Sequence, residues 1–472
     1  MKKNTIIPLL LFAAVFCVSQ FLQPYWLTRL ANNGLFLLTP DWLGDVLHGP
    51  HPLSELVGSF LVQFYDIPVT GPLIVAAVIT VIYLCEDVFL RKCGVPFHAL
   101  VSLLTALACW YFTARLDSNL PAVRVMLAAV FLGLVSLLIK RRTVLKQLRW
   151  ELPAALTALA LMTAVMCIDG RARAQEAMAR AQAGIRKHDW DGVLKFVTPG
   201  RCTVYPELIP YAVMALGEKD MLADNLFRYP VSSLADFGME GDNSLEGCLY
   251  NSILNECLGV PNEAIHQIYQ YSCHLPHGMS HLGLAQLARY SVEGGNFTLA
   301  RKYAGILMHN PRLRSSAKGL LRRIEGAADV ADTLGHSSST ALVMTKSPQL
   351  NLAQMSVSGI NSMHAINRYL CYMLMQGDVQ GFRQAYEAAD WGGRRVPLHY
   401  QEALLLAGAD PSSLNVSEDR LKRFSDFMVA LAGQQGSGSL GNSVRGTYWE
   451  YYLRIKDKEL SAEDSDASYP AS

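Results

Sequence analysis

Long runs of apolar residues alternate with short polar stretches over the first third of the chain. A membrane-spanning helix needs about 20 mostly apolar residues in succession to cross a hydrocarbon core of roughly 30 Å. Five runs meet this requirement, and they lie near residues 5–22, 67–84, 95–114, 120–139 and 152–168. The pattern therefore predicts a membrane domain at residues 1–169 with about five transmembrane helices.

From residue 170 onward the apolar positions recur at helical spacing, with almost no strand-like alternation. The clearest unit comprises His281–Val292 and Thr298–His309, separated by Gly294-Gly295-Asn296-Phe297 and closed by Pro311. Helix pairs with such turns are typical of tetratricopeptide repeats, which stack because one pair alone cannot bury its apolar face. The sequence therefore predicts an all-α chain, in which the membrane bundle is followed by a tetratricopeptide-like α-helical solenoid at residues 170–456.

Two segments interrupt this pattern. Residues 326–359 are rich in Ser, Thr and Gly, which is typical of a flexible linker. Residues 457–472 are acidic and Ser-rich, and this composition predicts a disordered tail.

Basic residues in short loops are retained in the cytoplasm, so their distribution predicts the orientation of the membrane domain. They lie before the first apolar run, between the second and third, and between the fourth and fifth: Lys2, Lys3, Arg91, Lys92, Lys140, Arg141, Arg142, Lys146 and Arg149. Arg171 and Arg173, directly after the fifth run, are at odds with this distribution. We expect a multi-pass protein of the bacterial inner membrane, with the N-terminus in the cytoplasm and the C-terminal domain in the periplasm.

The first apolar run admits a second interpretation, because a basic start followed by an apolar run is also typical of a signal peptide. A small-residue cleavage site is hard to find after it, which favours a retained membrane helix over cleavage.

The formal net charge is +1, which argues against a nucleic-acid partner because nucleic-acid-binding modules usually carry a strong basic bias. The ten cysteines form no CxxC pair, so a structural zinc site and a thioredoxin-type redox pair are both disfavoured. A weak metal candidate remains in Cys273, His274, His277 and His281. These residues flank Pro276 and Gly278 in a helix connection, where histidines are usually solvated or cap helices. We expect no cofactor.

The first outer loop, residues 23–66, contains aromatic and acidic residues. This composition is typical of a folded segment and not of a simple connector. One interpretation is a pair of helices lying on the membrane surface with their acidic groups in water. The other is that Asp41 or Asp45 acts as a general base or metal ligand at the membrane face. A second aromatic segment, Thr447-Tyr448-Trp449-Glu450-Tyr451-Tyr452, opens the last helix. Tyr448, Trp449 and Tyr452 are expected either to seal the end of the solenoid or to form a partner-binding patch.

Four segments carry a resemblance to a known family: Phe60–Tyr65 with Pro68 and Gly71, Gly295–Tyr303, Pro397–Leu404 and Thr447–Trp449. In these segments the chain resembles a family of functionally uncharacterised membrane proteins from Bacteroides-type bacteria. The resemblance implies membrane helices followed by tetratricopeptide-like helices. It brings no activity, substrate or catalytic residue.

The leading hypothesis for function is a membrane-anchored scaffold or assembly factor whose helical domain binds a protein partner in the cell envelope. The alternative is an envelope glycan- or lipid-modifying transferase that uses the acidic residues of the first outer loop. The two hypotheses differ in whether Asp41 and Asp45 are essential.

Overall fold

The computed structural model describes residues 3–116, 118–140, 150–238, 242–334, 348–357, 362–389, 391, 393–432 and 444–467. Within these residues the chain forms 24 α-helices, several short 3-10 helices and no β-strand, so the predicted all-α class is confirmed. The chain divides into two compact units. Unit 1 comprises Met1–Arg180 and Ile268–Ser338, and unit 2 comprises Ala181–Gln267 and Ser339–Ser472.

Unit 1 contains the apolar helices of the N-terminal part together with a later group of helices. Its elements are α1 (Lys3–Phe21), α2 (Pro24–Asn33), α3 (Pro40–His48), α4 (Pro52–Val62), α5 (Thr70–Cys93), α6 (His98–Thr113), α7 (Leu120–Val135), η1 (Ser136–Leu138), α8 (Glu151–Ile168), α16 (His281–Glu293), α17 (Phe297–Leu307) and α18 (Arg314–Leu334). Helices α9 (Gly170–Arg186) and α15 (Pro261–Cys273) contain the boundaries between the units.

Unit 2 is built from shorter helices. Its elements are α10 (Trp190–Phe196), α11 (Pro199–Val204), η2 (Pro206–Leu208), α12 (Ile209–Glu218), α13 (Leu222–Asn225), η3 (Leu226–Arg228), η4 (Leu234–Phe237), α14 (Leu245–Cys257), α19 (Pro348–Val357), α20 (Ser362–Gln376), α21 (Val379–Ala388), α22 (Leu398–Leu406), η5 (Pro411–Leu414), α23 (Glu418–Ala432) and α24 (Tyr448–Ala467).

Among the described residues, three helices are long and apolar enough to cross a membrane: Thr70–Cys93, Leu120–Leu138 and Glu151–Ile168. A fourth candidate is the pair Ile6–Phe21 and Pro24–Asn33, whose two helices meet at 82°. Helix α6 is apolar but has only 16 residues. At about 1.5 Å per residue it is roughly 24 Å long, which is shorter than a hydrocarbon core of roughly 30 Å. Length and composition therefore support three or four spans, where the sequence predicts about five.

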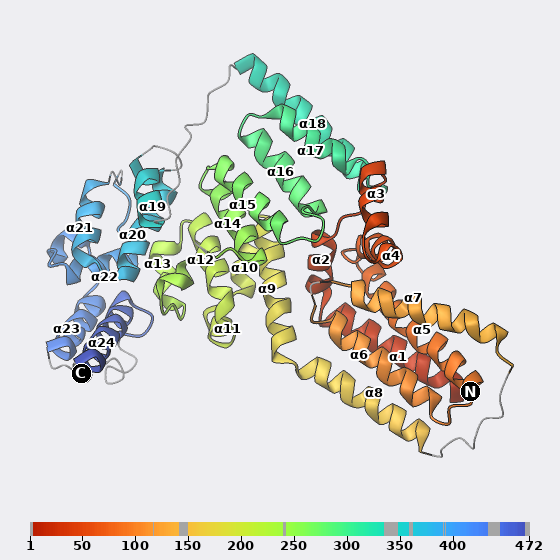
Figure 1. Ribbon diagram of the computed structural model, residues 1–472. Coiled ribbons are helices and arrows are strands. Elements are labelled where there is room, and N and C mark those ends of the chain that lie inside the picture. Colours follow the sequence, from red (N-terminus) through yellow and green to blue (C-terminus); the bar gives the residue numbers. More distant parts are fainter. Residues whose placement is uncertain are drawn as a thin grey trace. The chain divides into compact units, whose positions relative to one another are not determined.

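The apolar helices pack as a bundle around α5 (Figure 1). Helix α5 lies against α1, α6 and α7, and α8 lies against α1 and α6. On α5 the buried side chains of Val75, Ile79 and Ile82 recur at helical spacing. These residues face the fully buried Leu103 and Ala106 of α6 in one continuous apolar core. Periodic apolar positions thus determine which face of each helix is buried.

Helix α5 continues past its predicted end at Leu84 and reaches Cys93. The charged residues of this last part do not end the helix, because one of them is paired inside the bundle. Asp87 lies 2.5 Å from the Nδ1 atom of His98, the first residue of α6, and both side chains are buried. A buried carboxylate is tolerated when it has such a partner. The pair therefore joins the end of α5 to the start of α6.

Residues 23–66, which the sequence predicts to be the first outer loop, form three helices, α2, α3 and α4. Each begins at a proline, Pro24, Pro40 or Pro52. Proline suits the first position of a helix because its fixed φ matches the helical value and its missing N–H would have no partner there. The loop is therefore helical, in keeping with its structured composition.

Two expected segments fall partly outside the described residues. The predicted linker at 326–359 overlaps the end of α18 and all of α19, and its remaining residues are not described. The tail expected from residue 457 continues α24 as far as Ala467, and residues 468–472 are not described.

Candidate functional site

The helices α16, α17 and α18 pack side by side, and within unit 1 they are joined to the segment that contains α2, α3 and α4 (Figure 1). The backbone N–H of His281 donates to the carbonyl of Gly34 at 3.0 Å. The backbone N–H of Leu38 donates to the carbonyl of His309, also at 3.0 Å. The short segment 34–38 thus pairs with the start of α16 and with the residues that follow α17.

Asn310 lies at the centre of this junction and is fully buried. Its Nδ2 atom donates to the carbonyl of Phe36 at 2.8 Å and to Oε1 of Gln63 at 3.1 Å. Its Oδ1 atom accepts from the backbone N–H of Leu313 at 2.8 Å, just before α18 begins. We call Phe36, Gln63 and Asn310 the Asn310 contact. It satisfies buried polar groups from two parts of the chain that are more than two hundred residues apart.

Arg312 adds a charged interaction beside this contact. Its guanidinium donates to the carbonyl of Gln63 and lies 2.6 Å from the carboxylate of Asp66. Burial, together with the positive charge of Arg312, lowers the pKa of His281 to about 4. The imidazole of His281 is therefore neutral at neutral pH, and its Nε2 atom lies 3.4 Å from Nδ2 of Asn310.

The structure separates the four candidate metal ligands. The side chains of Cys273 and His274 are exposed. His277 lies with Nε2 3.8 Å from Oε1 of Glu55, while His281 is turned toward Asn310. Among the described residues no group of three or more His, Cys, Asp or Glu side chains is placed to hold a metal ion.

The two candidate catalytic acids, Asp41 and Asp45, lie one turn apart on α3, and both are exposed. Helix α3 is capped by Thr39, whose side chain accepts from the backbone N–H of Trp42. Neither aspartate side chain forms a hydrogen bond or ion pair with another described residue. Their placement is that of solvated residues on the outer face of an amphipathic helix.

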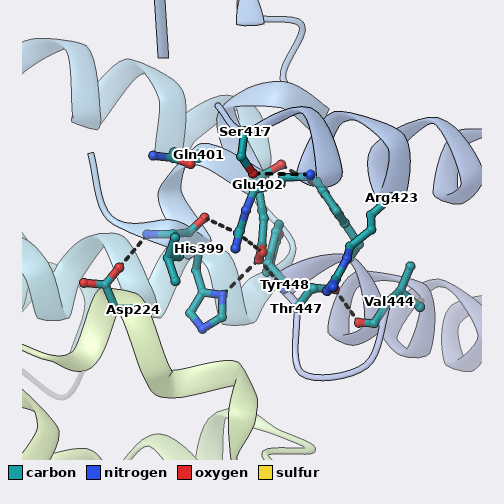
Figure 2. Close-up of polar contacts among 12 residues, drawn as sticks. Asp224, His399, Gln401, Glu402, Ser417, Arg423, Val444, Thr447 and Tyr448 are labelled. Carbon is teal, nitrogen blue, oxygen red and sulfur yellow. Dashed lines mark hydrogen bonds and ion pairs between the residues drawn. The ribbon is translucent and has the colours of Figure 1, made fainter. Parts of the chain in front are cut away.

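In unit 2 a buried carboxylate, Glu402 of α22, collects polar partners from several helices. Figure 2 shows that His399 and the backbone N–H of Tyr448 both reach Glu402; the distances to Oε2 are 2.9 and 2.8 Å. Its Oε1 atom accepts from the guanidinium of Arg420 on α23. We call these four residues the Glu402 cluster. The carboxylate caps the first turn of α24, where negative charge is favourable.

The predicted aromatic patch of α24 lies mostly inside unit 2. Tyr448 and Trp449 have no exposed surface, and Nε1 of Trp449 donates to the carbonyl of Glu402 at 2.9 Å. Tyr452 is half-buried beside Tyr448, with 6.0 Å between the ring centroids. Tyr448 and Trp449 therefore lie in the interior of unit 2, and neither exposes surface that a partner could contact.

A family model described as a family of unknown function (DUF6057) matches residues 2–168 and 146–455. Together the two matches cover both units and nearly all of the chain. The chain belongs to this family. DUF6057 has no assigned function, so membership agrees with the expected resemblance to an uncharacterised family and adds no activity. No curated protein and no solved structure matches the chain.

Several of the residues that organise this DUF6057 chain were not indicated by sequence patterns. Asn310 precedes Pro311 in the turn between α17 and α18, and its contacts with Phe36 and Gln63 have no local signal in the sequence. Glu402 lies within the apolar stretch that forms α22, and a lone acidic residue in an apolar helix is a sign of a buried, paired carboxylate. That sign was present in the sequence.

A shallow depression lies at the turn between α16 and α17, with a volume of about 470 Å³. It is lined by the turn residues 294–298, by Arg301 of α17 and by Ala328 of α18. The side chains of Thr298 and Arg301 are exposed. This face of the DUF6057 chain therefore offers a concave surface with an accessible positive charge.

Proposed function

We propose that this DUF6057 chain is a membrane-anchored scaffold that binds a protein partner in the cell envelope through its extramembrane helices. The observation that carries the proposal is the Asn310 contact. It holds the hairpin α16–α17 against the outer-loop helices with satisfied, buried hydrogen bonds, as expected of a preorganised binding platform. Among the described residues the candidate acids have no arranged partners, which favours a scaffold over a transferase.

For the membrane part we propose five crossings by α1, α5, α6, α7 and α8. Helix α6 is short, but it packs between α5 and α8 in the same bundle. A short apolar helix can be accommodated by local thinning of the bilayer or by its neighbours. With the basic loops inside, this arrangement has a cytoplasmic N-terminus and extramembrane helices in the periplasm.

We further propose that the helical pairs act as repeats and that the partner contacts the depression at the turn between α16 and α17. Arg301 is exposed at its edge, so a partner with an acidic segment would be complementary in charge. Concave surfaces on stacked helix pairs commonly bind another chain.

Deleting residues 364–452 would be a simple test of the scaffold proposal, but a poor one. Within unit 2, α20 packs against α12 and α22 packs against α13. Removal would expose the core of that unit. A sharper test places a photo-crosslinking amino acid at Thr298 in living cells and compares the otherwise unchanged chain with Arg301→Glu. The matched control is Lys318→Glu, which reverses the charge of an exposed residue on α18.

We expect one envelope protein to be crosslinked in near-equal amount, with the yield reduced at least tenfold by Arg301→Glu and unchanged by Lys318→Glu. Loss of an interaction worth about 1.4 kcal/mol is enough for a tenfold change in binding. The proposal fails if no defined protein is crosslinked, or if Arg301→Glu leaves the yield unchanged.

A further inference from the structure

Arg368 of α20 is among the largest fully buried side chains of the protein, with 1% of its surface exposed. Its Nε, Nη1 and Nη2 atoms are all buried, and no described residue accepts a hydrogen bond from any of them. An arginine carries five N–H donors and keeps its positive charge in proteins. A buried guanidinium without acceptors is therefore an uncommon and costly arrangement.

Two neighbours of Arg368 carry unsatisfied polar atoms as well. On His364, one turn earlier in α20, the Nε2 atom is buried without a hydrogen-bond partner. On Glu218, at the end of α12, the Oε1 atom is buried without one, although it lies 3.4 Å from Nδ1 of His364. We call Glu218, His364 and Arg368 the Arg368 cluster. Native proteins rarely leave several buried polar atoms unsatisfied in one place, and an absent small ligand or ordered water is a usual reason.

The surroundings of the guanidinium hold it in place. Its Cζ atom lies 5.0 Å from the centre of the Phe237 ring, in cation–π contact. On another side it lies against Gly217, where a Cβ atom would be 3.5 Å from Nη1 and 3.3 Å from Cε1 of His364. Arg368 is thus fixed by packing, and its donors are not used to fix it.

The positive charge of Arg368 favours an anionic ligand. Burial lowers the pKa of His364 to about 4, helped by the charge of Arg368, so the imidazole is neutral at neutral pH. Burial raises the pKa of Glu218, although Arg368 opposes this shift. Glu218 and Arg368 form no ion pair. Glu218 is near enough to interact electrostatically with Arg368, but no described carboxylate accepts a hydrogen bond from the guanidinium.

We propose that the Arg368 cluster is an internal binding site for a small planar oxyanion of the carboxylate class, the size of formate or bicarbonate. The planar fork of the guanidinium matches the two oxygens of a carboxylate, and such bidentate pairs are strong. Because Arg368 is fully buried, the ligand that we propose is a small one. This inference is independent of the scaffold function.

The test is binding of isotope-labelled formate to the full-length protein in mild detergent, measured by NMR line broadening during a titration. We expect saturable binding to one site. Arg368→Met keeps an unbranched apolar side chain beside Phe237, and it should weaken formate binding at least tenfold. The matched control is Arg394→Met, at an arginine whose side chain is 58% exposed, and it should bind as the wild type does.

If Arg368→Met does not fold, Arg368→Lys provides the second test. Lysine retains the charge, but its N–H donors all lie on one nitrogen and cannot form the planar fork of arginine. Formate binding should therefore again weaken about tenfold. The proposal is overturned if the wild type shows no saturable binding, or if either folded Arg368 variant binds formate as tightly as the wild type.

Discussion

The Glu402 cluster and the Arg368 cluster both place a charged side chain in the interior of unit 2, yet their hydrogen bonds differ completely. Both oxygens of Glu402 have partners, which are His399 of the same helix, Arg420 of α23 and the start of α24. Arg368 has no hydrogen-bond partner among the described residues. The first arrangement joins helices, while the second leaves its donors available for a ligand. Burial alone therefore does not distinguish a charged side chain that holds helices together from one that is available to bind a ligand. The number of its satisfied hydrogen bonds does.

Unit 1 supplies a further case of the satisfied kind. Asn310 is as deeply buried as Glu402, and both its nitrogen and its oxygen have partners. The Asn310 contact joins segments that are distant in sequence, as the Glu402 cluster joins α22, α23 and α24. Removing a buried group of this kind should lower the free energy of unfolding. The expected loss depends on how many hydrogen-bond partners are left unsatisfied by the removal.

The largest effect is expected from Glu402→Ala. It leaves the charge of Arg420 and the first N–H of α24 without their acceptor, and breaking a buried ion pair costs about 3–5 kcal/mol. Urea unfolding of the full-length protein in detergent, followed by tryptophan fluorescence, should show this loss. Glu387→Ala removes a carboxylate that is 59% exposed and should change stability by less than about 1 kcal/mol. Equal losses in the two variants would mean that the cluster does not hold the helices together.

A smaller effect is expected from Asn310→Ala. It leaves the carbonyl of Phe36 and the N–H of Leu313 unsatisfied, at a cost of about 1–3 kcal/mol. Hydrogen exchange should then accelerate at the amides of Leu38 and His281, which pair across the same junction. Exposed Asn262→Ala is the control and should leave both amides protected. Unchanged exchange in Asn310→Ala would show that the junction does not depend on this contact.

A third prediction concerns Glu176, a carboxylate that has hydrogen-bond partners and yet is expected to titrate near neutral pH. It accepts from the backbone N–H groups of Tyr25 at 3.0 Å and Trp26 at 2.8 Å, at the start of α2. Burial raises the pKa of Glu176 from 4.5 to about 7, although these hydrogen bonds and Arg180 oppose the shift. The folded protein therefore binds the proton more tightly than the unfolded chain does. This contribution to stability is complete below about pH 4.5 and is lost as the pH rises through 7.

The measurement compares the pH dependence of unfolding in the wild type and in Glu176→Gln, which cannot titrate at this position. Between pH 4.5 and 7 the wild type should lose stability relative to the variant. A difference that stays constant over this range, or that grows in favour of the wild type, would contradict the raised pKa.

The smallest effect is expected from Asp41→Asn and Asp45→Asn. Both residues are exposed on α3 and have no hydrogen-bond or ion-pair partner among the described residues, so stability should change by no more than about 0.5 kcal/mol. The crosslinking yield at Thr298 should also stay the same. Loss of cellular function with unchanged expression and unchanged crosslinking would favour a transferase in place of a scaffold.

Periodic patterns in the sequence predicted several helices well, because burial of an apolar face is a local property. The predicted segments His281–Val292 and Leu152–Ile168 each agree with the observed helix to within one residue. The end of α5 was missed because Asp87 is charged, and only its pairing with His98 explains why the helix continues. A single sequence does not show which distant residue will neutralise a charge.

The same limit applies to the candidate sites. The exposed Asp41 and Asp45 attracted attention because acidic residues in a loop are easily seen in a sequence. Arg368 lies in an ordinary amphipathic helix, and its buried, unsatisfied state becomes visible only when α12 and η4 are placed beside it. The grouping of residues 268–338 with the apolar N-terminal helices likewise depends on contacts such as that between Asn310 and Gln63.

The most direct test of the distinction between satisfied and unsatisfied buried charges is thermal unfolding with and without formate, at constant ionic strength. Three proteins are compared: the wild type, Glu402→Gln and Arg368→Met. Formate should raise the unfolding temperature of the wild type and of Glu402→Gln, because a ligand that binds only the folded state stabilises it. It should leave Arg368→Met unchanged. An equal response of Arg368→Met and the wild type, or no response in the wild type, would contradict the account.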